Sequence, residues 1–149
     1  MIRSAMPSGK IRAFLDTNVL LEYLRGKVEL QSLFSEDVRQ RAAFAINAIV
    51  LQELLLARDR TEGGVDLTRV VPYLEVVGAG VDLSSPEVIA ELHQLRNRLV
   101  HANDVLILAG ARSCDVLLTY DRDLLAAGPA AAVRSETPED FLDELGTAA

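Results

Sequence analysis

The rest of the chain is arranged around residues 11–25, IRAFLDTNVLLEYLR. Its apolar start predicts a buried strand over 11–16, and the apolar spacing that follows predicts a helix over 19–25 with Asn18 as N-cap. Asp16 is therefore expected at the carboxyl end of a strand, where open α/β sheets build their sites. On its own this is modest evidence for a site, because turns also favour Asp.

Length and composition narrow the class of protein. The 149 residues, half of them hydrophobic, predict a single domain over 1–149 with a loose segment over 1–10. A net charge of −7 argues against binding to nucleic acid through a broad basic surface, but not against a nuclease whose metal ions supply positive charge. The single cysteine, Cys114, excludes a disulfide framework. No apolar run reaches the roughly 18 residues of a membrane span, so we expect a cytoplasmic protein without a membrane partner.

Strand and helix patterns alternate along the rest of the chain. Further strands are predicted over 42–46, 75–77, 116–119 and 132–133. Further helices are predicted over 28–39, 48–59 with Asn47 as its cap, 66–74, from Pro86, 103–113 and 137–145. This alternation predicts an α/β fold, in which helices cover both faces of a parallel sheet.

Two carboxylates occupy positions that look unfavourable. Glu53 projects between Ile49 and Ala57 on its predicted helix, and Asp104 shares a helix face with Ile107. A charged group in an apolar stripe destabilises the fold unless something satisfies it. Each residue also has an ordinary explanation, because the Glu stem can reach water and an Asp in a first helical turn complements the helix dipole.

Two more acids, Asp121 and Asp123, follow the predicted strand at 116–119. One of them is expected to cap the next helix. If the strands that precede Asp16 and Asp121 are neighbours, both acids point into one crevice, and Glu53 and Asp104 can join them. Four converging carboxylates repel one another, and hard cations that prefer oxygen ligands, Mg²⁺ or Mn²⁺, relieve this. Such a site can activate water for phosphodiester hydrolysis.

The same residues carry a resemblance to a known family. The segments FLDTNVLLEYLRG (14–26), IVLQELLLA (49–57), NDVLILAGA (103–111), LLTYDRDLL (117–125) and VRSETPEDFL (133–142) resemble the PIN domain, and within it the VapC-type toxins of toxin–antitoxin pairs. The resemblance covers nearly the whole chain, from about residue 11 to 145. One departure is LVHAN (99–103), which stands where the family has a Gly-containing turn, so the shape of that loop is left open.

The resemblance implies a three-layer α/β/α fold with a parallel sheet of about five strands in the order 3-2-1-4-5. It also implies a Mg²⁺- or Mn²⁺-dependent ribonuclease, with Asp16, Glu53, Asp104 and Asp121 as the catalytic, metal-holding acids. Supporting roles fall on Thr119, which lines the site, on Asn18, which holds the first turn, and on Asp123, an outer acid. The implied partners are RNA, a VapB-like antitoxin and a second copy of the chain. The predicted helices over 19–25, 28–39 and 48–59 are the expected docking surfaces for the antitoxin.

Other sites with clustered acids fit the sequence less well. A receiver domain needs a late lysine, and none follows Lys27. A haloacid-dehalogenase-like phosphatase needs a second Asp two residues after Asp16, where Asn18 stands, and it needs a late lysine as well. The alternative that stays open is a catalytically silent PIN-like module that binds RNA or a protein.

Overall fold

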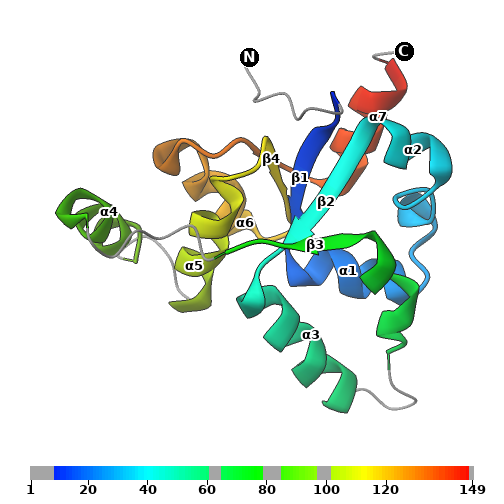
Figure 1. The fold of residues 1–149 in the computed structure, drawn as a ribbon, viewed down its shortest axis with the longest axis horizontal. Helices are drawn as coiled ribbons and strands as arrows, with labels where there is room; N and C mark the ends of the chain where they lie inside the picture. The colour runs from blue at the N-terminus through cyan, green and yellow to red at the C-terminus, as the bar shows by residue number, and fades with distance from the viewer. Residues whose placement is uncertain (1–8, 61–64, 79–84, 97–101, 148–149) are drawn as a thin grey trace.

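A computed structural model of the protein describes residues 9–60, 65–78, 85–96 and 102–147. Its centre is one parallel sheet of five strands in the order β3-β2-β1-β4-β5 (Figure 1). The strands are β1 (Ile11–Leu15), β2 (Ala42–Ile46), β3 (Leu74–Val76), β4 (Val116–Leu118) and β5 (Ser135–Glu136). The predicted α/β class and strand order are therefore confirmed.

Helices cover both faces of this sheet. They are α1 (Thr17–Leu24), α2 (Glu36–Arg41), α3 (Ala48–Arg60), α4 (Pro86–Arg96), α5 (Ala102–Ala111), α6 (Arg122–Ala127) and α7 (Pro138–Thr147), with short 3₁₀ helices η1 (Val28–Leu30), η2 (Leu67–Arg69), η3 (Val71–Tyr73) and η4 (Pro129–Ala131). Successive strand residues point to opposite faces, and Ala13, Phe14 and Leu15 of β1 are all fully buried. Within the described residues, no helix has the length and apolar character needed to cross a membrane.

Helix α5 packs closely against the sheet at Gly110. A side chain at Gly110 would come within 2.9 Å of the Phe14 ring and 2.7 Å of the Asn47 side chain. Asn47 joins this contact to α3, because its Nδ2 donates to the Leu106 carbonyl (3.0 Å) and its Oδ1 accepts from Val50 N–H (3.1 Å). The second bond confirms Asn47 as the cap of α3. Small and polar residues thus fix α5, and the acid in its first turn, against the strand ends.

The structure corrects two predicted helices. The stretch 28–39 forms η1, a turn and then α2, because Ser35 is extended and its hydroxyl accepts from Val38 N–H at 3.4 Å, which starts a new helix. The stretch 66–74 forms η2 and η3 instead of one helix. Pro72, in the first turn of η3, has no N–H to continue a helix through this segment.

The predicted last strand over 132–133 is also wrong. Ala132 has a positive φ of 58°, a left-handed conformation that does not fit a strand. Val133 is buried, which explains its apolar character, but strand β5 begins two residues later at Ser135.

Candidate active site

The register of the two central strands brings the first acid to the fourth strand. Leu15 pairs with Leu118, and Asp16 N–H donates to the Leu118 carbonyl at 3.0 Å. One residue beyond this pair, Thr119 Oγ1 donates to Asp16 Oδ2 at 2.7 Å. Asp16 Oδ1 accepts from Thr17 N–H at 2.7 Å, so both carboxylate oxygens are held. With 5% of its surface exposed, Asp16 is a buried acid in a fixed orientation.

Asp16 is also the N-cap of α1, which begins at Thr17. The prediction that Asn18 caps this helix is therefore wrong, since Asn18 lies inside the first turn. Its Oδ1 accepts from Tyr120 N–H at 3.3 Å instead, which joins the turn after β1 to the turn after β4. This contact crosses between elements about a hundred residues apart, so no local sequence pattern could have indicated it.

Asp121 caps the helix that follows it and also lies at the site, the two roles that the sequence allowed for it. Its Oδ1 accepts from Asp123 N–H (2.8 Å) and Leu124 N–H (3.3 Å), which makes it the N-cap of α6. Its own N–H donates to Thr119 Oγ1 at 3.0 Å. The hydroxyl of Thr119 thus bridges the two acids at the strand ends, and the side chain of Thr119 is fully buried.

The other two acids come from helices. Glu53 of α3 accepts a 2.7 Å hydrogen bond at Oε1 from Thr17 Oγ1, a contact that the sequence analysis missed. Asp104 lies in the first turn of α5 with 7% of its surface exposed. Asn103 precedes it inside the same helix.

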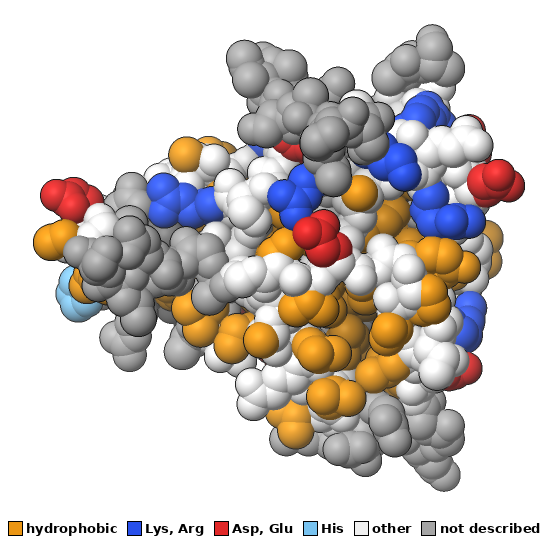
Figure 2. Space-filling model, viewed as in Figure 1, with side chains coloured by type: hydrophobic (Ala, Val, Ile, Leu, Met, Phe, Trp, Pro, Cys, Tyr) orange, Lys and Arg blue, Asp and Glu red, His pale blue; other side chains and the backbone are white. Residues whose placement is uncertain are grey.

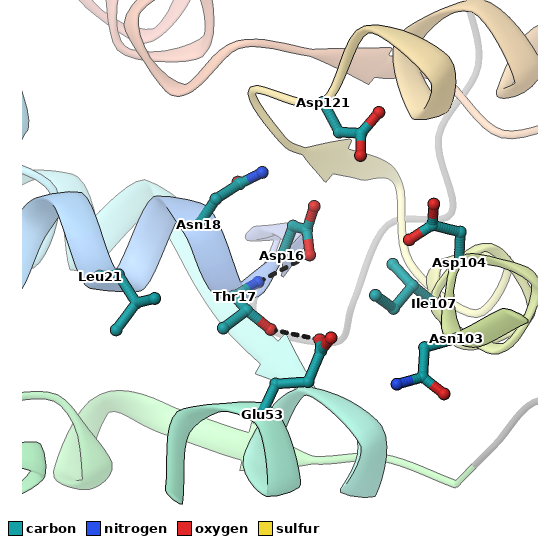
Figure 3. A pocket seen from close by; sticks show the side chains of 9 residues that line it. All are labelled: Asp16, Thr17, Asn18, Leu21, Glu53, Asn103, Asp104, Ile107 and Asp121. Atoms are coloured by element: carbon teal, nitrogen blue, oxygen red, sulfur yellow. Dashed lines mark hydrogen bonds between the residues drawn. The ribbon is translucent and has the colours of Figure 1, made fainter. Parts of the chain in front are cut away.

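The four predicted acids line one cavity of about 480 Å³ (Figure 3). The other residues that line it are Thr17, Asn18, Leu21, Asn103 and Ile107. Asp123 is not among them and lies exposed in the first turn of α6, so its predicted role as an outer acid stays a prediction. Most of the divergent loop at 99–103, His101 included, lies outside the described residues.

The charges of this cavity act on one another. Burial raises the pKa of Asp16 from its ordinary 3.8 to about 6, and the negative charges of Glu53 and Asp121 add to the rise. The Thr119 hydroxyl and the Thr17 N–H lower it, because they donate to the ionised carboxylate. Asp16 is thus a carboxylate whose ionisation would be favoured by a cation nearby.

The side chains that line the cavity offer carboxylate, hydroxyl and amide oxygens. In the described parts of the chain, no three acidic, histidine or cysteine side chains form a group that could hold a metal ion as they stand. Mg²⁺ keeps several water ligands and is bound through one or two carboxylates, so an open cavity lined by carboxylates matches it. All-oxygen donors also match Mg²⁺ or Mn²⁺ rather than softer ions.

The comparisons with known proteins agree with the fold. A profile of the PIN domain matches residues 13–128. A chain of VapBC2 from Rickettsia felis, solved with a DNA fragment from their promoter, aligns with a TM-score of 0.62 at 18% identity, covering 85% of this chain and 98% of that chain. A chain of DNA-bound VapBC from Salmonella typhimurium aligns with a TM-score of 0.60 at 21% identity, covering 85% and 98%. A comparison with curated protein sequences gives no match.

Proposed function

This chain belongs to the PIN domain family, and we propose that it is a metal-dependent endoribonuclease, the toxin of a VapBC-type pair, acting in the cytoplasm. The observation that supports this most is the cavity lined by Asp16, Glu53, Asp104 and Asp121. Acids from two strand ends and two helices meet there, although each by itself has an ordinary structural explanation.

In the proposed site, Asp16, Asp104 and Asp121 would hold Mg²⁺ or Mn²⁺. When bound, the ion lowers the pKa of a water molecule and neutralises charge on the phosphodiester. The protein's own part is orientation. Thr119 directs Asp16 and fixes the backbone of Asp121, and the Asp121 oxygen that caps α6 leaves the second oxygen of that carboxylate for the cavity.

Glu53 fits the role of a proton acceptor as well as that of a ligand. Its Oε1 accepts from Thr17 Oγ1, which leaves Oε2 to take a proton from the attacking water. Attack by water leaves a 5′-phosphate and a 3′-hydroxyl on the cleaved RNA. A 2′,3′-cyclic phosphate would instead indicate attack by the 2′-hydroxyl of the RNA and would contradict the proposal.

We further propose a VapB-like antitoxin and a second copy of the chain as partners. Of the helices expected to dock the antitoxin, α3 leaves Leu55 and Leu56 over 40% exposed. The same helix contributes Leu51 and Leu54 to an apolar cavity of about 140 Å³, which is also lined by Ile46, Leu67, Val70, Val71, Leu74 and Val76. Figure 2 shows hydrophobic side chains gathered over this part of the molecule. Co-expression with the adjacent small open reading frame tests the antitoxin, and the mass of the purified protein in solution tests the dimer.

The competing hypothesis is a PIN-like module that binds RNA or a protein without cleaving. The decisive experiment incubates the purified protein with a mixed RNA pool, with Mn²⁺, with Mg²⁺ and with EDTA, and determines the ends of the products. We expect cleavage with either ion, none with EDTA, and 5′-phosphate ends. RNA that is bound but stays intact with both ions would favour the silent module.

A further inference from the structure

Three side chains from distant parts of the sequence meet at Tyr120, the residue that precedes Asp121. Lys27 precedes η1, Tyr120 follows β4 and Glu139 lies in the first turn of α7. Tyr120 Oη donates to Glu139 Oε2 at 2.8 Å and accepts from Lys27 Nζ at 3.1 Å, and Lys27 Nζ also lies 2.9 Å from Glu139 Oε2. We call this group the Tyr120 cluster. The three members lie close together without lining the cavity.

Tyr120 connects this cluster to the acids. It stands between Thr119, whose hydroxyl joins Asp16 to the Asp121 backbone, and Asp121 itself. Its N–H donates to Asn18 Oδ1, so its backbone is tied to the first turn while its hydroxyl is tied to Lys27 and Glu139. A residue held at both ends in this way limits how far the 119–121 turn can rotate.

The three groups of the Tyr120 cluster keep their protonation states and their mutual contacts near neutral pH. Burial raises the pKa of Tyr120 to about 12, so its hydroxyl keeps its proton at assay pH. Although burial alone would raise the pKa of Glu139, hydrogen bonds from Lys27 and Tyr120 lower it. Lys27 also lies over the Tyr120 ring, 4.2 Å from its centre. The ammonium, the phenol and the carboxylate therefore keep the same protonation across neutral pH.

We propose that Tyr120 is a positioning residue, whose hydroxyl, held by Lys27 and Glu139, fixes the turn that presents Asp121 and Thr119 to the metal site. This rests on the proposed nuclease function. The hydroxyl acts through the turn and does not touch substrate. Loss of the hydroxyl is therefore expected to weaken metal binding while RNA binding is retained.

The test is Tyr120→Phe, which keeps the ring beside Lys27 but removes both hydrogen bonds of the hydroxyl. Mn²⁺ binding is measured by electron paramagnetic resonance of the free ion, and cleavage is titrated with Mn²⁺ in parallel. Mutating a residue that hydrogen-bonds to a metal ligand typically weakens metal affinity ~10–100-fold. The Tyr120 hydroxyl acts on Asp121 only through the turn, so we expect a smaller effect, a rise of about three- to tenfold in the half-saturating Mn²⁺ concentration in both assays. The KM for RNA should stay within about twofold.

Tyr73→Phe is the matched control, because it makes the same chemical change on η3, away from the cavity, and should leave the Mn²⁺ titration unchanged. Glu139→Ala and Glu139→Gln change the residue that accepts the hydrogen bond from Tyr120. They test the same contact if Tyr120→Phe fails to fold. The amide oxygen of Gln can still accept from Tyr120, so Glu139→Gln should bind Mn²⁺ more tightly than Glu139→Ala.

Wild-type Mn²⁺ affinity in both Tyr120→Phe and Glu139→Ala would overturn the positioning role and leave the nuclease proposal intact. Equal weakening by Tyr73→Phe would also overturn it, since the effect would then follow from general destabilisation. A wild-type protein that binds no Mn²⁺ and cleaves no RNA would instead overturn the proposed function, and the positioning role with it.

Discussion

Asp16 and Asp121 follow neighbouring strands, whereas Glu53 and Asp104 project from helices α3 and α5. The strand-end pair is fixed by backbone N–H groups and by the bridging hydroxyl of Thr119. The helix pair depends on how the helices pack: α5 is set by the close approach of Gly110 to Phe14, and Glu53 is oriented by the Thr17 hydroxyl.

The difference separates two ways of building one site. Strand ends in a parallel sheet share a register, so their acids are placed by the same hydrogen bonds that form the sheet. Acids on helices are instead placed by how each helix packs against the rest of the fold, and Glu53 also has a longer side chain than the three aspartates. We therefore regard Asp16 and Asp121, which are placed by the sheet itself, as the preorganised half of the site, and Glu53 and Asp104 as the half that depends on helix packing.

The largest expected effect comes from the preorganised half. Asp16→Asn removes a charge from the cavity, and we expect kcat/KM for RNA cleavage to fall by at least about a thousandfold, since the metal ion would lose a buried anionic ligand and the transition state would lose the positive charge that the ion supplies. The measurement is a cleavage assay at saturating Mn²⁺.

The control for this substitution is Asp123→Asn, which makes the same change outside the cavity. We expect it to retain activity within about threefold, because exposed charges interact weakly with their surroundings. Wild-type cleavage by Asp16→Asn would refute the nuclease assignment. A large loss in Asp123→Asn would support the prediction that this residue is an outer acid of the site.

The strand-end half of the site was also the easier half to predict from sequence. An apolar run followed by an acid marks both Asp16 and Asp121, and the strand at 42–46 has the bounds that its apolar pattern indicated. The helix acids could be recognised because a charge in an apolar face is unfavourable without a reason. The resemblance then supplied the strand order that brings the four together.

What sequence could not supply were contacts across the fold and the exact course of short elements. The bonds from Thr17 to Glu53 and from Asn18 to Tyr120 depend on packing that no local pattern encodes. Strand β5 is two residues long at a sheet edge, too short for a periodic signal. The 66–74 segment is apolar enough for a helix, but Pro72 lacks the N–H that a continuous α-helix would need at that position.

The second effect is on stability. Native Asp16 keeps its proton until about pH 6, whereas the unfolded chain loses it near 3.8, so the native state binds more protons between these values. The stability that this residue contributes is present below pH 3.8 and is lost as the pH rises through 6. The loss amounts to at most about 3 kcal/mol.

This loss is measured by urea unfolding of the metal-free protein. Because Asp16→Asn removes the titration, the free energy of unfolding of the variant minus that of the wild type should grow between pH 4 and pH 7.5. A difference that stays constant with pH would mean that the Asp16 carboxyl is hydrated in the absence of metal.

The smallest effects are expected from removing the hydroxyls of Thr119 and Thr17, one for each half of the site. Thr119→Val keeps the shape of the side chain but leaves Asp16 and the Asp121 N–H without their shared partner, and we expect kcat/KM to fall about a hundredfold. Thr17→Val removes the bond to Glu53 alone, and because Glu53 can settle on another partner we expect a loss of about tenfold. Both are measured in the same Mn²⁺-dependent cleavage assay. If Thr17→Val lowers kcat/KM more than Thr119→Val does, the orientation of Glu53 limits the reaction. The placement of Glu53 would then matter more than the placement of the strand-end acids.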